Sequence, residues 1–141
     1  MYSWKLNDVP GDGNCLFSAI GRSLQKPASE LRSIAVHWAS QPGQTMNGNL
    51  VKDWIQWNFN MSPEVYLSML EKNGFWGGAN EMSILANALS IAIIVFEKSG
   101  VHTAKKKYEF FPDLKTPETR AVCVLYTGGN HYMQISLQRN P

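Results

Sequence analysis

Cysteine is scarce in this sequence of 141 residues, which contains only Cys15 and Cys123. Two cysteines can form at most one disulfide, so the chain is not a disulfide-stabilised scaffold, and we expect both to be free thiols in a reducing compartment. The spacing of the two cysteines and three histidines matches no zinc-binding pattern. We therefore expect no structural or catalytic metal and no other cofactor.

Long hydrophobic runs are also lacking. None is longer than residues 91–96, which have the length of a strand and fall far short of the roughly 18 apolar residues that span a bilayer. The first ten residues, MYSWKLNDVP, lack the apolar segment of a secretory signal peptide. These absences predict a cytoplasmic protein with no membrane partner, located in the host cytosol if a pathogen encodes it.

An excess of charge of one sign is missing as well, because 13 Lys and Arg residues face 11 Asp and Glu residues, a net charge of +2. Proteins that bind nucleic acid usually show a concentrated basic face, so we expect no nucleic-acid partner. With 44% apolar and 17% charged residues, the composition is typical of a chain that buries a core. The length fits a single domain, which we expect to span residues 1–141, and a monomer is the default expectation.

Helical patterns dominate the first two thirds of the chain and extended patterns the last third. Periodic apolar positions and a helix start at Ser62-Pro63-Glu64 predict the helices, and runs of β-branched residues predict the strands. The sum is an α+β domain in which helices pack around a small, mainly antiparallel sheet. The expected helices are 15–24, 30–39, 50–59, 63–72 and 79–89; the expected strands are 91–96, 101–111, 121–126 and 132–137; residues 1–9 receive no assignment and 41–48 a loop.

Cys15 has a setting that suits a nucleophile. It follows the turn 10–14, rich in Gly, Asp and Asn, and it opens an expected helix. The N-terminus of a helix carries unpaired N–H groups and a partial positive charge, which favour a thiolate and can hold a developing oxyanion. The alternative is that Cys15 is a small buried apolar residue, which is the usual role of a free cysteine.

His131 is the candidate base. It follows Gly128-Gly129-Asn130 at the start of the last expected strand, and the base of a nucleophilic cysteine commonly comes from a distant part of the sequence. A single histidine at the start of a strand is more often structural, so this alternative stays open. His37 and His102 have no comparable setting, and we expect neither to be catalytic.

Three segments together resemble the ovarian-tumour (OTU) family of deubiquitinating cysteine proteases. GDGNCLFSAI at 11–20 resembles its nucleophile motif, WGGANE at 76–81 its central segment, and NHY at 130–132 its histidine motif, in the order of the family. The resemblance covers about residues 10–138. It implies a papain-like OTU fold, no metal, and hydrolysis of the isopeptide bond after the C-terminal glycine of ubiquitin, polyubiquitin or a ubiquitin-like modifier.

The resemblance also implies roles for the residues of the first motif. Cys15 would attack the scissile carbonyl. His131 would accept the thiol proton, or form an ion pair with the thiolate, and would later protonate the leaving amine. The N–H groups of Cys15 and of the loop 12–14 would form the oxyanion hole. Asp12 would hold this loop by hydrogen-bonding its backbone, and Gly13 would let the loop come close to the substrate.

A narrow channel for the modifier's Gly-Gly tail is the second implied feature. Glu81 could pair with an arginine near this tail. The alternative is purely structural, with a core aromatic at Trp76, a turn at Gly77-Gly78, and an acid at Glu81 that stabilises the first turn of a helix. Lys105-Lys106-Lys107 is expected to be a solvated strand edge. The residues expected to contact substrate are Gly13, Asn14, Trp76, Gly77, Gly78, Asn130 and Tyr132.

Met133 departs from the pattern of the family. Many OTU proteases carry Asp or Asn two residues after the histidine, where the side chain points the same way along a strand and can hold the imidazole. Methionine cannot do this. Asp8 or Asn7 is a possible third member from upstream of the nucleophile, and a Cys-His dyad is the other possibility.

Three functions are therefore kept open. The first is a cysteine-type deubiquitinase, that is, a ubiquitinyl hydrolase and thiol protease of the ubiquitin conjugation pathway. The second is a catalytically weak or inactive OTU module that binds ubiquitin, which the methionine at position 133 allows. The third is a cysteine protease that processes a larger polyprotein with the same site.

Overall fold

The structure, a computed structural model, describes residues 2–7, 12–101, 103–129 and 131–139. These residues form five helices, a five-stranded sheet and a separate two-stranded ladder. The helices are α1 (Cys15–Leu24), α2 (Ala28–Ala39), α3 (Val51–Phe59), α4 (Pro63–Glu71) and α5 (Ala79–Leu89). The strands are β1 (Tyr2–Asn7), β2 (Thr45–Met46), β3 (Asn49–Leu50), β4 (Ile91–Lys98), β5 (Ala104–Phe110), β6 (Arg120–Gly128) and β7 (His131–Arg139).

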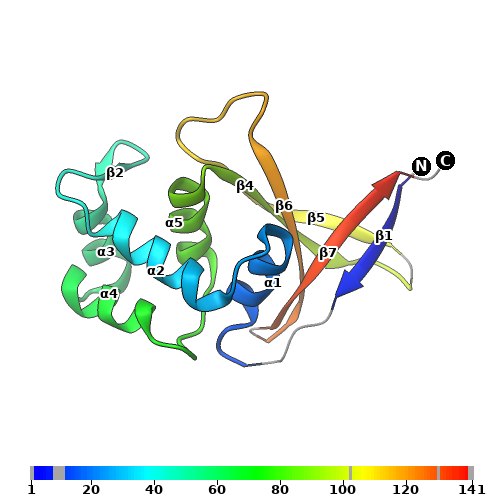
Figure 1. The fold of residues 1–141 in the computed structure, drawn as a ribbon, viewed down its shortest axis with the longest axis horizontal. Helices are drawn as coiled ribbons and strands as arrows, with labels where there is room; N and C mark the ends of the chain where they lie inside the picture. The colour runs from blue at the N-terminus through cyan, green and yellow to red at the C-terminus, as the bar shows by residue number, and fades with distance from the viewer. Residues whose placement is uncertain (1, 8–11, 102, 130, 140–141) are drawn as a thin grey trace.

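The main sheet has the strand order β1-β7-β6-β4-β5 (Figure 1). Every neighbouring pair is antiparallel except β4 and β6, which run parallel. The α+β class and the mainly antiparallel sheet are therefore confirmed. β6 and β7 form the expected hairpin, with Tyr126 opposite Tyr132 and Gly128 opposite His131.

Three local expectations were incomplete. The first residues form β1, an edge strand whose Tyr2 lies opposite Arg139 and whose Asn7 lies opposite Gln134. Helix α2 begins at Ala28, directly after Pro27, two residues earlier than expected. The polar loop 41–48 contains β2 and part of the turn that leads to β3, a ladder too short to show in a sequence pattern.

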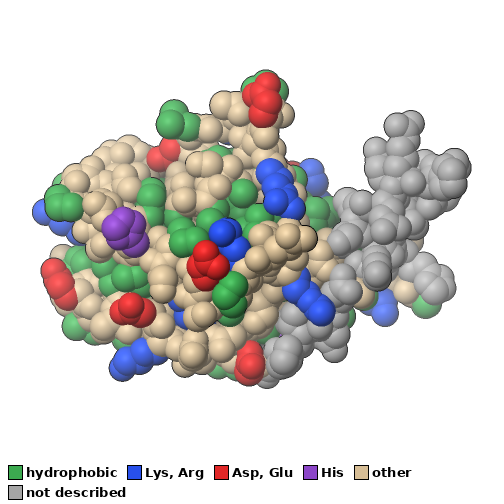
Figure 2. Space-filling view, viewed as in Figure 1, with side chains coloured by type: hydrophobic (Ala, Val, Ile, Leu, Met, Phe, Trp, Pro, Cys, Tyr) green, Lys and Arg blue, Asp and Glu red, His purple; other side chains and the backbone are tan. Residues whose placement is uncertain are grey.

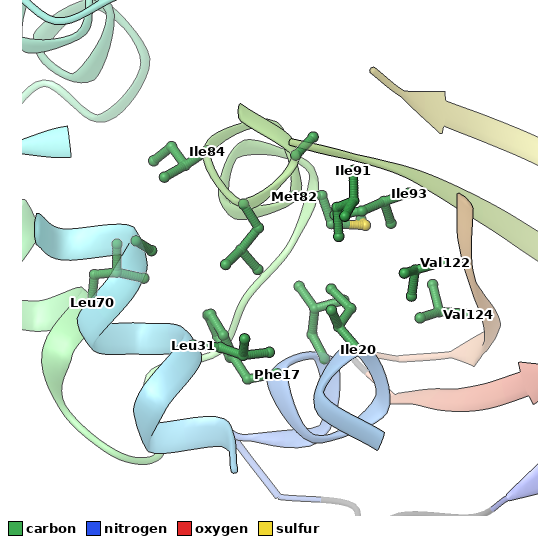
Figure 3. Packing of buried hydrophobic residues seen from close by; sticks show 14 of the residues in the cluster. Phe17, Ile20, Leu31, Leu70, Met82, Ile84, Ile91, Ile93, Val122 and Val124 are labelled. Atoms are coloured by element: carbon green, nitrogen blue, oxygen red, sulfur yellow. The ribbon is translucent and has the colours of Figure 1, made fainter. Parts of the chain in front are cut away.

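The core lies between the sheet and the helices. Helix α1 packs on β6 and β7, α5 packs on β4, and α2 contacts α1, α4 and α5 (Figure 1). Ser62 caps α4 by accepting a hydrogen bond from the N–H of Val65 at 3.3 Å, as its sequence predicts. The apolar side chains that meet in this core include Phe17, Ile20, Leu31, Leu70, Met82, Ile84, Ile91, Ile93, Val122 and Val124 (Figure 3).

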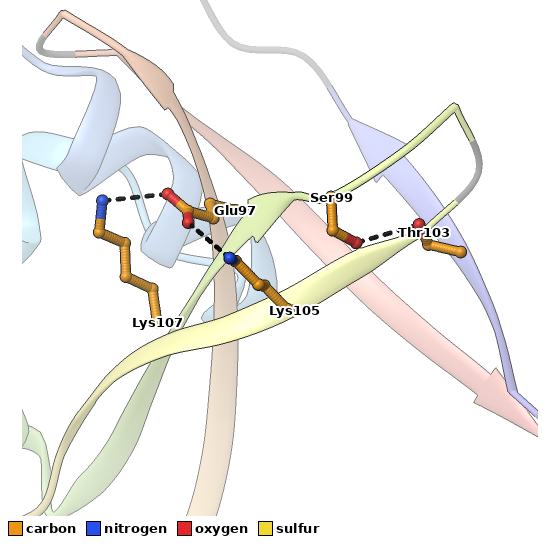
Figure 4. Close-up of polar contacts among 5 residues, drawn as sticks. All are labelled: Glu97, Ser99, Thr103, Lys105 and Lys107. Carbon is orange, nitrogen blue, oxygen red and sulfur yellow. Dashed lines mark hydrogen bonds and ion pairs between the residues drawn. The ribbon is translucent and has the colours of Figure 1, made fainter.

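Strand β5 is the other edge of the sheet and carries the three lysines. Glu97 on β4 accepts from Lys107 at 3.0 Å and lies 3.6 Å from Lys105 (Figure 4). Ser99 and Thr103 bond across the following turn at 3.0 Å. The lysine run is thus a solvated edge as expected. On the face shown in Figure 2, acidic and basic side chains are interspersed.

Candidate active site

The loop before α1 is a tight turn organised by Asp12. The Cys15 N–H donates to the Asp12 carbonyl at 3.1 Å, and the Asn14 N–H donates to the Asp12 carboxylate at 2.9 Å. Cys15 is the first residue of α1 and is only 1% exposed. Two of the amides expected in the oxyanion hole, those of Cys15 and Asn14, are therefore engaged within the loop in this structure.

The start of β7 lies beside the Cys15 thiol. The backbone N–H of Tyr132 interacts with this thiol, as do amides at the helix start. His131, the first residue of β7, is half-buried, and α1 packs along this strand. The structure therefore brings together Cys15 and the segment that carries the expected base, although more than one hundred residues separate them in sequence.

The turn that leads into His131 depends on glycine. Gly128 has a φ of 100°, a region that favours glycine, and the sheet register shifts between Tyr126 and Gly128. The Tyr126 hydroxyl donates to the Gly129 carbonyl at 2.5 Å, and the Thr127 hydroxyl donates to the His131 carbonyl at 3.3 Å. These bonds fix the end of β6 against the start of β7. Asn130, an expected substrate contact, lies outside the described residues.

The structure describes only some of the residues considered for the third catalytic position. Met133 is half-buried on β7, two residues after His131, and a thioether is at best a weak acceptor. Asn7 ends β1 opposite Gln134, so the chain upstream of the nucleophile runs toward the His131 end of β7. Asp8 lies outside the described residues.

Burial dominates the acidity of Cys15. The thiol's pKa is raised above its ordinary value by burial, which outweighs the lowering effect of the N–H groups of Tyr132 and Leu16. The nearby Asp12 carboxylate raises the pKa further. The amides at the helix N-terminus do lower the pKa of Cys15, as expected, but the loss of hydration has the larger effect, so the net shift is upward.

Alkylation of Cys15 by iodoacetamide should therefore keep accelerating with pH. Below its pKa a thiol gains about tenfold in thiolate per pH unit, so the rate should show no plateau below about pH 8.5. The measurement is the alkylation rate of a Cys123→Ala variant, which isolates Cys15, between pH 6 and about 9.5 by mass spectrometry. A plateau near neutral pH would instead indicate a preformed thiolate–imidazolium pair.

The residues expected to line the tail channel lie next to this site. Trp76 is 43% exposed. Gly77 is buried against α1, where an added Cβ would lie 2.8 Å from Leu16 and 2.9 Å from Phe17. An added Cβ on Gly78 would meet only a Glu81 carboxylate oxygen within 4 Å, at 3.9 Å. A cavity of about 290 Å³ reaches from these glycines to the start of β7, lined among others by Gly77, Gly78, Met82, Tyr108, Tyr126 and Tyr132.

Glu81 holds the Gly78 end of this channel from inside the protein. One carboxylate oxygen accepts the Gly78 N–H at 2.7 Å, and the other accepts the Tyr66 hydroxyl at 2.5 Å. Burial, together with Glu81, raises the pKa of Tyr66. Glu81 is buried in the first turn of α5, so the structural interpretation of this residue holds.

Gly13 and Asn14, two expected substrate contacts, are packed and bonded against the segment that holds Gly74. An added Cβ on Gly13 would lie 1.9 Å from the Gly74 carbonyl oxygen, so the absence of a side chain serves the packing of two backbone segments. The Asn14 side-chain oxygen accepts the Gly74 N–H at 3.0 Å. It also accepts hydrogen bonds from Arg32, a residue that the sequence analysis did not single out.

Two features are absent from the residues that the structure describes. Among them, no group of three or more His, Cys, Asp or Glu side chains is placed to hold a metal ion. Within the same residues, no helix combines the length and apolar character needed to cross a membrane.

Comparisons with known proteins agree with the geometry. In a search of curated proteins, the chain is 26% identical over 100 residues to a protein of Invertebrate iridescent virus 6 named "Putative ubiquitin thioesterase 232R". The match covers 69% of this chain and 14% of that protein, so this chain spans a small part of its relative's length.

Solved structures share the fold. The OTU domain protease of Dera Ghazi Khan virus superposes with a TM-score of 0.72 at 23% identity, covering 96% of this chain and 82% of the other. An OTU deubiquitinase from Wolbachia pipientis wMel, solved bound to ubiquitin, gives 0.65 at 16% identity, covering 95% and 96%. The family model described as "OTU-like cysteine protease" matches residues 10–132, which include Cys15, the central segment and the start of β7, and the chain therefore belongs to this family.

Proposed function

We propose that this chain is a cysteine-dependent deubiquitinase that hydrolyses the isopeptide bond after the C-terminal glycine of ubiquitin, polyubiquitin or a ubiquitin-like modifier. The observation that carries the proposal is the meeting of Cys15, at the start of α1, with the first residues of β7. Membership in the family and relatives that are named for ubiquitin thioesterase activity or solved with bound ubiquitin support the choice of substrate.

The reaction uses two half-reactions. The Cys15 sulfur attacks the glycine carbonyl while His131 takes the thiol proton, and a tetrahedral intermediate forms. When the carbon–nitrogen bond breaks, His131 returns the proton to the leaving lysine amine, which leaves a thioester between the modifier and Cys15. Water, deprotonated by the same imidazole, then attacks the thioester, and the carboxylic acid and free thiol are released.

At least one backbone N–H of the loop 12–14 must give up its hydrogen bond within the loop before it can bind the oxyanion. The Asn14 N–H is held by the Asp12 carboxylate at 2.9 Å, so the substrate's developing oxyanion has to replace this carboxylate. Asp12 is exposed, which leaves it free to turn toward solvent. An oxyanion at that position would gain a donor in a site with little water, where such bonds contribute most.

The cavity between Gly78 and Tyr132 offers a route for the modifier's tail. It leads to the start of β7, and its glycine wall admits an extended backbone without side chains. Trp76 and Tyr108, both substantially exposed, lie on the segments that border it. We propose that the tail binds here, with the scissile bond at the Tyr132 end, beside the Cys15 thiol.

A direct test uses ubiquitin that carries a C-terminal electrophile. The purified chain should gain the mass of one ubiquitin, and ubiquitin with an ordinary C-terminal carboxylate should give no adduct under the same conditions. Parallel reactions with other modifiers that end in Gly-Gly would define the preference among modifiers. No adduct and no ubiquitin binding by a folded sample would remove ubiquitin as the substrate and turn attention to polyprotein junctions.

A weak or inactive ubiquitin-binding module is the second candidate. Met133 in place of an orienting acid and the raised pKa of the Cys15 thiol favour it. Binding of ubiquitin without an adduct would support this candidate. If the enzyme is active, Asn7→Ala and Asp8→Ala variants test the upstream third member, and an unchanged kcat in both would leave the Cys-His dyad. We further propose that the protein is a monomer and that it is located in a reducing cytosol.

A further inference from the structure

Arg32 is a buried cation whose hydrogen bonds converge on the loop that precedes Cys15. Its side chain is 0% exposed, and its guanidinium lies 4.1 Å from the centre of the Phe17 ring. The acceptors are three backbone carbonyls and one side-chain amide oxygen. They are Gly13 at 3.1 Å, Leu70 at 2.8 Å, Phe75 at 2.7 Å, and the Asn14 Oδ1, which accepts from Nε at 3.0 Å and from Nη2 at 2.7 Å.

Burying the charged side chain of Arg32 costs free energy, whereas burying an apolar side chain in its place would not. A buried guanidinium loses its hydration, and burial lowers the pKa of Arg32. Its hydrogen-bond acceptors are neutral carbonyl and amide oxygens, while Glu81 and Asp12 act on it through their charges. The planar fork of arginine can satisfy several acceptors in fixed directions, which a lysine cannot do.

The bond to the Gly13 carbonyl fixes the orientation of one peptide plane. In a trans peptide the C=O and the following N–H point in opposite directions. Because Arg32 holds the Gly13 carbonyl inward, the N–H of Asn14 is turned away from Arg32, and it is this N–H that the Asp12 carboxylate accepts. Rotation of this peptide would leave a buried guanidinium without one of its acceptors.

The same side chain ties the loop to the segment before α5. Asn14 Oδ1 accepts from both Arg32 and the Gly74 N–H, and Gly13 is in direct backbone contact with Gly74. Arg32 also holds the carbonyls of Leu70 and Phe75, on either side of that turn. The nucleophile loop and the approach to the tail channel are therefore fixed to one buried group.

We infer that Arg32 is a positioning residue that sets the Gly13–Asn14 peptide, and with it the amide that receives the oxyanion. It touches neither substrate nor Cys15 in this role. The inference rests on the proposed function, because it assigns a part in the acyl-transfer step at the same site.

The test compares Arg32→Lys, which keeps the charge but loses the fork, with Asn14→Ala, which keeps Arg32 and removes its shared acceptor. Both should lower kcat on a ubiquitin amide roughly 10- to 100-fold, since a misplacement of about 1 Å or the loss of one oxyanion donor has effects of this order or larger. KM should stay within about threefold. Alkylation of Cys15 by iodoacetamide, which forms no oxyanion, should change by less than about threefold, and hydrogen exchange at the Gly74 amide should accelerate.

The matched control is Ile55→Val, a change in a buried side chain of α3, away from this loop. A purely structural role for Arg32 would lower kcat in proportion to the folded fraction and would raise the rate of alkylation, because unfolding exposes the buried Cys15 thiol. This outcome, which a destabilised control would also show, would overturn the inference. Unchanged kcat in Asn14→Ala would also overturn it, even if Arg32→Lys failed to fold. A wild-type protein that neither binds nor cleaves ubiquitin would instead overturn the proposed function and the catalytic part of this inference with it.

Discussion

Replacing Cys15 with alanine is expected to reduce hydrolysis of a ubiquitin isopeptide to background, a loss of roughly 10⁴-fold or more, as for other enzymes that lose their nucleophile. The adduct with electrophilic ubiquitin should disappear as well. Binding of ubiquitin should persist, because the cavity that would hold the tail is built from α5, β4 to β7 and the glycine segment. The measurements are steady-state kinetics and the dissociation constant of the variant.

Cys123 provides the control for this experiment. It is half-buried on β6, and burial raises its pKa. A Cys123→Ala variant should keep kcat within about twofold and still form the adduct. If it lost the adduct while Cys15→Ala kept it, the assignment of the nucleophile would be wrong.

Replacing His131 with alanine is expected to lower kcat on an isopeptide by roughly 10³- to 10⁴-fold. The loss should be smaller on a ubiquitin thioester. An amine must be protonated as it leaves, whereas a thiolate is a good leaving group without a proton, so only the base function of His131 is missing on the thioester. The ratio of the two losses therefore separates the acid and base roles.

His37 is the matched control for this variant. It lies exposed in the last turn of α2 and contacts Gln41, so His37→Ala should leave both activities within about twofold. Equal losses on the two substrates in His131→Ala would argue against a proton-donating role for His131.

The family and the nucleophilic helix could be predicted because their signals are local. The expected bounds 15–24 and 79–89 are those of α1 and α5, and the three motifs lie where the family model matches. Apolar spacing along a helix and glycine-rich turns depend on neighbours in sequence, so one sequence shows them.

Strand β1 shows what local reasoning overlooked. The segment YSWKLN alternates apolar and polar residues over its whole length, which is the signal of a strand. Its partner β7 lies at the other end of the chain, however, so no neighbouring turn marked it as half of a pair. The alternation of apolar and polar residues is sufficient by itself to predict a strand at residues 2–7.

Arg32 and the acidity of Cys15 depend on tertiary contacts. Arg32 follows Leu31 in the expected helix 30–39, and arginine is a residue type that is usually exposed. Its burial results from contacts with Gly13, Leu70 and Phe75, which are distant in sequence. The helix start at Cys15 was expected to favour a thiolate, but the balance between amides and burial requires knowing how deeply the thiol lies. Both cases involve desolvation, which has no signature in sequence spacing.

The pairing of β1 with β7 has a kinetic consequence. Tyr2 and Arg139 are paired although 137 positions separate them, so among the described residues their contact closes the longest loop. Loop-closure entropy favours contacts between near neighbours, and an edge strand with one partner, as β1 is, detaches more readily than a central strand. We expect β1 to dock late in folding and to undock first, which would turn β7, the strand that begins with His131, into a sheet edge open to another extended chain.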